Sequence, residues 1–161
     1  MSKIYTRTGD SGESSVRDER LRKDALVFDV LGDLDELNSW LGVLKGASWV
    51  RESVQAPWRS RGFIEEIQVA LMALSADIAG YGTFSVDLVK RLEDAVDALS
   101  PQGTFSLRLP EGHVHVVRTV CRRAERRLVA FDNHHPGLPF LNRLSDYLYV
   151  LALNTTPPTC G

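Results

Sequence analysis

Apolar residues recur at helical spacing in five segments of this 161-residue chain, and this periodicity constrains the fold more than any other feature. In the first segment they stand three or four positions apart, as they do along one face of a helix. Glycine or proline interrupts the pattern between segments. Five helices with short connections predict an all-α, up-and-down five-helix bundle. The expected helices cover residues 24–45, 60–79, 86–99, 110–131 and 140–153.

The remaining residues predict loops around one helical domain. Residues 1–23 are polar and rich in Gly, Thr and Ser with no sustained period, which predicts an N-terminal loop segment. A turn at 100–103 precedes a short piece at 104–109 that alternates in character and predicts extended backbone. Residues 155–161 predict a frayed tail. The chain is long enough to bury one full core, so we expect a single domain over residues 1–161.

Composition narrows the class of protein. A hydrophobic content of 43% and a net charge of −2 are ordinary for a globular protein, and the lack of a basic excess argues against general nucleic-acid binding. No apolar run approaches the ~20 residues that cross a bilayer, and Met1–Asp10 lacks the apolar core of a secretory signal. Cys121 and Cys160 are too few for a disulfide framework or a structural zinc site. We therefore expect a cytoplasmic protein with no nucleic-acid or membrane partner.

Arginine is concentrated in residues 118–129, R-T-V-C-R-R-A-E-R-R-L-V, which hold five arginines and one glutamate. On a helix, four of these charged residues share one face, and the apolar residues form a separate stripe. Arginine grips phosphate or carboxylate through two hydrogen bonds at once. The segment is therefore either a site for a small polyanion on a rigid helix or a basic surface helix. The shared charged face holds Arg118, Arg122, Glu125 and Arg126, and the apolar stripe holds Val117, Val120, Cys121, Ala124 and Leu128.

A second candidate for anion binding is T-R-T-G-D-S-G-E-S-S, at Thr6–Ser15. Gly9 and Gly12, flanked by hydroxyl residues, suit a sharp turn that points backbone N–H groups at an anion. An ordinary surface turn has the same composition, so both interpretations stay open. The motif is not a Walker loop, because G-x-x-x-x-G-K-[ST] occurs nowhere in the chain.

Five further polar residues occupy positions of interest in the expected helices. Asp35 stands mid-helix among apolar neighbours and is a candidate to pair with an arginine from elsewhere. Asn142 and Asp146 are four residues apart and can reach one shared site. His113 and His115 point in different directions from a helix, so solvated or capping roles are favoured over metal binding.

Motifs in three parts of the chain together point to a family. They are I-Y-T-R-T-G-D-S-G at 4–12, G-D-L-D-E-L-N-S at 32–39, and R-T-V-C-R-R-A-E-R-R followed by F-L-N-R-L-S-D-Y-L. In order and separation they resemble the PduO-type ATP:cob(I)alamin adenosyltransferases over residues 4–152. The resemblance implies a homotrimer of five-helix bundles with ATP at each subunit interface. It also implies a transferase that moves the 5′-deoxyadenosyl group of ATP to the cobalt of reduced cob(I)alamin, releasing triphosphate.

The same resemblance assigns roles to individual residues. The N-terminal loop of the family wraps the triphosphate, and Mg²⁺ is held through the ATP phosphates. Asp35 matches an aspartate that pairs across subunits with the arginine at Arg122, and Glu125 matches an acid near ribose and Mg²⁺. The implied catalytic set is Arg122, Glu125, Arg126 and Asp35. The implied ATP-binding set is Thr6, Arg7, Thr8, Gly9, Asp10, Gly12, Ser14, Ser15, Lys23, Arg118, Arg122, Glu125, Arg126 and Asn142.

The chain departs from the family pattern in several places. Ser11 and Glu13 replace a lysine and a threonine, and Glu13 adds negative charge beside a triphosphate. Residues 16–18, Val-Arg-Asp, stand where the family has Gly-Gly, and Asp33 replaces a threonine. The segment L-P-E-G at 109–112 is shorter than its counterpart in the family, which lies toward the corrin. These departures leave open a divergent member that binds ATP or a corrinoid as a sensor or carrier without catalysis. A purely structural helical oligomer is a third interpretation. If the chain is an active transferase, we expect a corrinoid reductase or a corrinoid-dependent enzyme as a protein partner.

Overall fold

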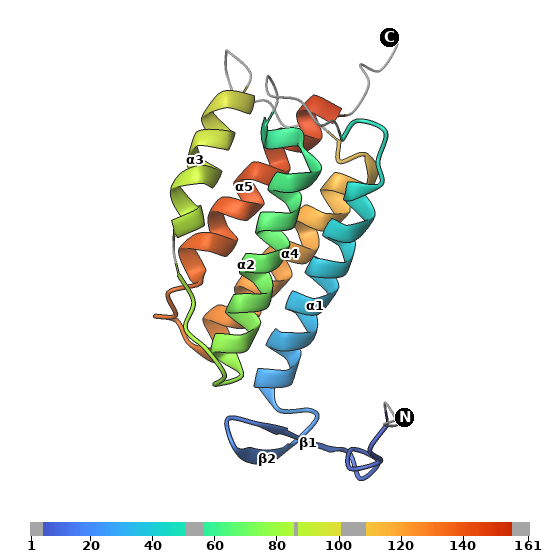
Figure 1. The fold of residues 1–161 in the computed structure, drawn as a ribbon, viewed down its shortest axis with the longest axis vertical. Coiled ribbons are helices and arrows are strands. Elements are labelled where there is room, and N and C mark those ends of the chain that lie inside the picture. The colour runs from blue at the N-terminus through green and yellow to red at the C-terminus, as the bar shows by residue number, and fades with distance from the viewer. Residues whose placement is uncertain (1–4, 51–56, 86, 101–108, 156–161) are drawn as a thin grey trace.

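A computed structural model describes residues 5–50, 57–85, 87–100 and 109–155. Within these ranges five α-helices run alternately up and down side by side (Figure 1), as the apolar periodicity predicts. No helix in the described ranges is long and apolar enough to cross a membrane. The helices are α1 (Leu26–Lys45), α2 (Arg61–Ile78), α3 (Asp87–Leu99), α4 (Gly112–Phe131) and α5 (Leu138–Thr155), with a short 3₁₀ turn, η1 (Pro57–Arg59).

Helix α4, which carries the arginine segment, lies at the centre of the packing. It contacts α1 on one side and α5 on the other, while α2 packs on α1 and α3 packs on α5. Its predicted apolar stripe is confirmed, because all five stripe residues are buried. Burial of this stripe against two neighbours fixes the rotation of α4, so the side chains on its other faces point in set directions.

The predicted helix boundaries are right to within about two residues, a margin typical of helix ends. Ser60 caps α2, because its Oγ accepts a hydrogen bond of 3.1 Å from the backbone N–H of Phe63. Gly80, with φ +84°, ends α2 in the left-handed region. Helix α5 extends to Thr155, so this residue is not part of a frayed tail. The expected tail at 156–161 and the extended piece at 104–108 lie outside the described residues.

The expected N-terminal loop contains a β-hairpin, which the sequence analysis missed. Strands β1 (Glu13–Val16) and β2 (Glu19–Arg22) pair antiparallel, with Val16 opposite Glu19. Arg17 and Asp18 form the two-residue turn with φ of 53° and 60°. Strands of four residues give little alternation to read, and this turn lacks the Asn-Gly or Asp-Gly signature of such hairpins. The hairpin lies beside the start of α1 at one end of the bundle (Figure 1).

Gly137, in the connection between α4 and α5, is required by close packing. A Cβ atom at this position would lie 2.4 Å from Leu74 Cδ1 and 3.1 Å from His135 Nδ1. Leu74 is fully buried, so it has little room to move away. We expect Gly137→Ala to lower the free energy of unfolding by roughly 1–2 kcal/mol through overpacking. Urea denaturation measures this, with Gly62→Ala on the open surface of α2 as the control, and equal stability of the two variants would contradict the steric account.

Candidate functional site

Two arginines on the outward face of α4 have no hydrogen-bond or ion-pair partner among the described residues. Arg122 and Arg126 are exposed, and neither forms a hydrogen bond or ion pair within the described part of the chain. They are one helical turn apart, so both guanidinium groups can reach the same anion. Cations held on a rigid helix without a partner in the described residues are available to an anion, as the predicted polyanion site requires, and the same exposure is found on a basic surface helix.

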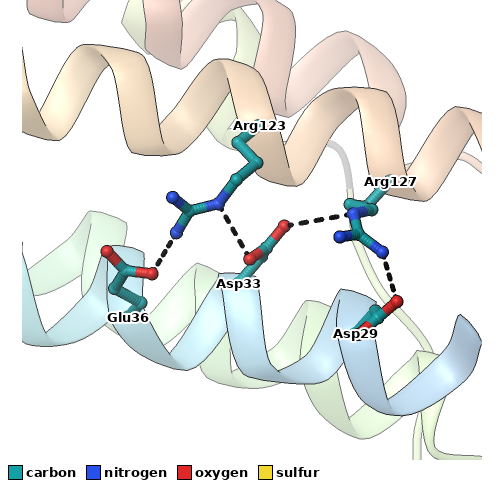
Figure 2. Close-up of polar contacts among 5 residues, drawn as sticks. All are labelled: Asp29, Asp33, Glu36, Arg123 and Arg127. Atoms are coloured by element: carbon teal, nitrogen blue, oxygen red, sulfur yellow. Dashed lines mark hydrogen bonds and ion pairs between the residues drawn. The ribbon is translucent and has the colours of Figure 1, made fainter. Parts of the chain in front are cut away.

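Two further arginines of the segment, Arg123 and Arg127, point to α1 instead (Figure 2). Arg123 Nε donates to Asp33 Oδ1 at 3.0 Å, and a second nitrogen of Arg123 pairs with Glu36. Arg127 pairs with Asp29, and its Nε lies 4.0 Å from Asp33 Oδ2. Burial alone would lower the pKa of Arg123, but the bonds to Asp33 and Glu36 outweigh it and raise the pKa. This network fixes α4 on α1 with Arg122 and Arg126 turned away from the pairing.

The sequence analysis did not find this network, although a signal was present. The three acids stand at i, i+4 and i+7 on α1, and the two arginines stand at i and i+4 on α4, so each set lies on one face of its helix. Asp33 replaces a threonine of the family pattern, and in the structure this carboxylate sits between two guanidinium groups with a side chain only 15% exposed. Asp33 therefore gives this chain an added ionic contact between α1 and α4.

A chain of hydrogen bonds connects α4 to α5 next to the free arginines. Asn142 Nδ2 donates to Glu125 Oε1 at 3.0 Å, so these two candidate site residues are in contact. Arg143 Nη1 donates to Asn142 Oδ1 at 2.8 Å and to Asp146 Oδ2 at 3.0 Å, and Arg143 Nε bonds Glu93 of α3 at 3.1 Å. Asp146 thus contacts Asn142 only through Arg143. The sequence analysis missed Arg143, which orients the amide of Asn142 and so the carboxylate of Glu125.

Arg118, the first arginine of α4, contacts a histidine and not a carboxylate. Its Nε donates to Nδ1 of His115 at 3.3 Å. The expectation of a solvated or capping His115 is wrong, because this side chain is only 7% exposed inside α4. Burial and the nearby charge of Arg118 both lower the pKa of His115. His113 is exposed and stacks on Trp40 with ring centroids 6.3 Å apart.

The lowered pKa of His115 predicts a dependence of stability on pH. The ordinary histidine pKa is 6.5, so below this pH the unfolded chain binds a proton that folded His115 does not. Stability should therefore fall as the pH drops from 7.5 to 5.5, since protonation also removes the acceptor for Arg118. We expect His115→Gln to show a smaller fall over this range in urea titrations. His134→Gln, on an exposed loop residue, should keep the wild-type dependence, and a wild-type slope in His115→Gln would contradict this assignment.

The predicted phosphate loop is folded by its own backbone and by a lysine. Lys23 Nζ donates to the carbonyl oxygen of Gly9 at 2.9 Å, and its backbone N–H donates to Gly12 O at 2.9 Å. The N–H of Gly12 donates to Gly9 O at 3.2 Å, and Gly12 has a φ of +82°. The hydroxyls of Thr6 and Thr8 are 2.8 Å apart. The loop is therefore a compact turn closed by Lys23.

The remaining loop residues lie along the same segment. Arg7 adopts a positive φ of 63° and stacks on the ring of Tyr5, while Asp10 is exposed. Ser14 and Ser15 lie on β1 opposite Leu21 and Arg20. The described residues show no hydrogen bond or ion pair between this loop and the predicted residues on α4 and α5. Asp35 is exposed on α1 and has no polar partner in the described ranges.

The predicted site residues thus lie on two separate surfaces of the chain. One is the loop and hairpin, and the other is the exposed face of α4 with Asn142. Within the described residues, no three His, Cys, Asp or Glu side chains gather closely enough to hold a metal ion by themselves.

Comparisons with known proteins agree with the motifs. The cobalamin adenosyltransferase family model matches residues 4–155. The chain is 38% identical to a cobalamin adenosyltransferase of Cupriavidus metallidurans, with 94% of this chain and 87% of the relative covered. It is 35% identical to the corrinoid adenosyltransferase MMAB of Bos taurus, with 96% and 72% covered.

Solved structures give the same result. A variant of the PduO-type ATP:corrinoid adenosyltransferase from Lactobacillus reuteri, complexed with cobalamin and ATP, superimposes with a TM-score of 0.78 at 31% identity. The alignment covers 93% of this chain and 91% of that one. A second variant of that enzyme, complexed with ATP, also gives a TM-score of 0.78, with 92% and 91% covered. This chain therefore belongs to the cobalamin adenosyltransferase family.

Proposed function

We propose that the protein transfers the 5′-deoxyadenosyl group of ATP to the cobalt of a reduced corrinoid. The observation that carries this proposal is that Arg122 and Arg126 are exposed without a partner in the described residues. They lie beside the hydrogen-bonded Glu125–Asn142 pair, in a chain that belongs to this family. A triphosphate is the polyanion that such a face suits, because guanidinium groups bind phosphate oxygens in pairs. Relatives of known structure carry ATP and cobalamin, which supports the same pair of substrates here.

The reaction requires positioning more than acid–base chemistry. In this proposal the Co(I) of the corrinoid substrate attacks C5′ of ATP with its electron pair, the Co–C bond forms, and the C5′–O bond breaks. The electrons of that bond leave with the triphosphate. Arg122 and Arg126 stabilise the charge that develops on this leaving group. No proton has to be transferred, and the described site offers no nucleophilic side chain paired with a base.

Mg²⁺ fits the residues present as a partner of the triphosphate. This ion typically takes one or two carboxylates together with substrate phosphates and water. Glu125 is the residue that would contact it, because Asn142 engages only Oε1 of its carboxylate. The ion, when bound, neutralises part of the phosphate charge. Asn142 and Arg143 hold the Glu125 carboxylate in place for that contact.

We also propose that the complete site forms between subunits of a homotrimer. The loop and the α4 face make no polar contact with each other in the described part of one chain, which suits a site shared by neighbouring copies. Asp35 and Arg122 are both exposed without partners in those ranges, so each is available to the other across an interface. Light scattering of the purified protein should give a mass near three chains of 17.9 kDa. A monomer would refute the shared site.

The alternative of a non-catalytic ATP or corrinoid carrier rests on the altered loop. Its support is Ser11, the negative charge of Glu13 beside the phosphates, and the shortened L-P-E-G segment at 109–112. In the structure Glu13 Oε2 accepts a hydrogen bond of 2.9 Å from Arg20 Nε, so this charge is paired inside the hairpin. Both side chains are nearly half exposed, so the pairing offsets the charge only partly. The catalytic proposal is therefore favoured.

An anaerobic assay separates the two functions. Protein, ATP, Mg²⁺ and chemically reduced cobalamin are mixed, and the loss of the Co(I) absorbance is followed. We expect formation of a light-sensitive adenosylated product and of triphosphate in equal amounts. ATP binding without product would support the carrier, and absence of both ATP binding and product would remove both proposals.

A further inference from the structure

Arg17, at the tip of the β1–β2 hairpin, makes polar contacts with the bundle, next to Val16, which is buried in the core. Its Nε donates a hydrogen bond of 2.8 Å to the carbonyl oxygen of Ile78, and its backbone N–H donates one of 3.1 Å to Ala79 O. These carbonyls lie at the end of α2, where the last carbonyl groups of a helix have no partner inside the helix. A guanidinium is favoured there, because the helix dipole places partial negative charge at that end.

The same side chain also reaches α4, the helix that carries the free arginines. The guanidinium carbon of Arg17 lies 5.2 Å from the ring centroid of Phe131, the last residue of α4. Beside Arg17, a Cβ atom on Gly80 would lie 3.0 Å from its Cγ and 3.4 Å from its Cα. The end of α2 is thus shaped to receive Arg17. One side chain connects the hairpin to the ends of two helices.

The backbone at the hairpin tip indicates that this contact is maintained at a cost. Arg17 and Asp18 both have positive φ, in a region that glycine and asparagine favour and other residues rarely adopt. Arg17 lies within residues 16–18, where the family pattern has a Gly-Gly pair, and glycine would adopt this turn without strain. Strain in a turn persists when the surrounding contacts hold it, and here those contacts are the hydrogen bonds of Arg17 and the burial of Val16.

We propose that Arg17 is a positioning residue that holds the N-terminal segment for ATP. This inference rests on the proposed function. The hairpin is tied to the phosphate loop by polar contacts: Arg20 bonds Thr8 O, and Lys23 bonds Gly9 O and Gly12 O. Fixing the hairpin tip therefore fixes the loop through these bonds. Because Phe131 ends α4, the same contact also holds the loop to α4 of its own chain.

The first test measures the attachment itself and does not depend on activity. Hydrogen exchange followed by mass spectrometry reports the protection of amides in residues 13–22. We expect exchange there to be about tenfold faster in Arg17→Ala, which loses the bond to Ile78 O and the contact with Phe131. Asp18→Gly is the matched control, because it relaxes the same turn and keeps the Arg17 side chain. Unchanged exchange in Arg17→Ala would overturn the attachment.

The second test measures the consequence for ATP. Calorimetric titration should show ATP binding weakened about tenfold in Arg17→Ala and mostly restored in Arg17→Lys, while Asp18→Gly stays within about twofold of wild type. The KM for the corrinoid should stay within about twofold. Equal losses for ATP and corrinoid, or faster hairpin exchange with unchanged ATP affinity, would overturn the positioning role. If the wild-type protein binds no ATP, the proposed function fails, and the exchange data alone still decide the attachment.

Discussion

An Arg122→Ala variant is expected to lose adenosyl transfer by about 10²–10³-fold in kcat, the range found when one preorganised donor to a developing negative charge is removed. Arg122 is exposed on α4 and has no partner in the described part of its own chain, so its charge is available to the leaving triphosphate. For the same reason the free energy of unfolding of each subunit should change by less than about 0.5 kcal/mol. Loss of Co(I) absorbance under anaerobic, saturating conditions measures the effect.

Two controls separate chemistry from charge and from assembly. Arg122→Lys keeps the charge but not the two-pronged grip, so its activity should lie between those of wild type and Arg122→Ala. Arg61→Ala removes an exposed arginine at the start of α2 and should leave kcat unchanged. Light scattering shows whether a variant keeps the wild-type mass, since Arg122 is also the proposed partner of Asp35 across the interface. Wild-type activity in Arg122→Ala would refute the assignment of this site.

The parts of the site that sequence could predict are those set by one helix alone. A period of three to four residues decides which side of α4 is buried, and it therefore places Arg122, Glu125 and Arg126 on one outward face. The Glu125–Asn142 contact is not among these parts, because it depends on which helix lies beside α4 and at what height.

Contacts between distant segments could not be predicted in this way. The sequence analysis gave Arg123 and Arg127 no separate role, and only the packing of α4 on α1 shows that they bind acids there. Arg17 reaches Ile78 across 61 residues of sequence, and no local pattern encodes that pairing. Periodicity gives the orientation of a helix to its core, but not which helix lies beside it or at what height.

Breaking the ionic contact between α4 and α1 is expected to have a large effect on the stability of the fold. An Arg123→Met variant is expected to lower the free energy of unfolding by about 2–3 kcal/mol, between the cost of a lost charge-assisted hydrogen bond and that of a broken buried pair. Methionine keeps much of the apolar stem and loses the guanidinium. Asp33, whose side chain is 15% exposed, then keeps only Arg127, 4.0 Å away. Denaturation in urea measures the loss, which should lower Tm by several degrees.

The order of effects within the network distinguishes this explanation from a general loss of surface charge. Arg127→Met should cost less than Arg123→Met, because Asp33 keeps its hydrogen bond to Arg123. Glu36→Gln should cost under about 1 kcal/mol, since its ion pair is largely exposed. Replacing Asp33 by leucine in the Arg123→Met background should recover part of the stability, because no carboxylate is then left poorly solvated. Equal costs for all three single variants, or no recovery in the double variant, would show that Asp33 is not the centre of the α1–α4 contact.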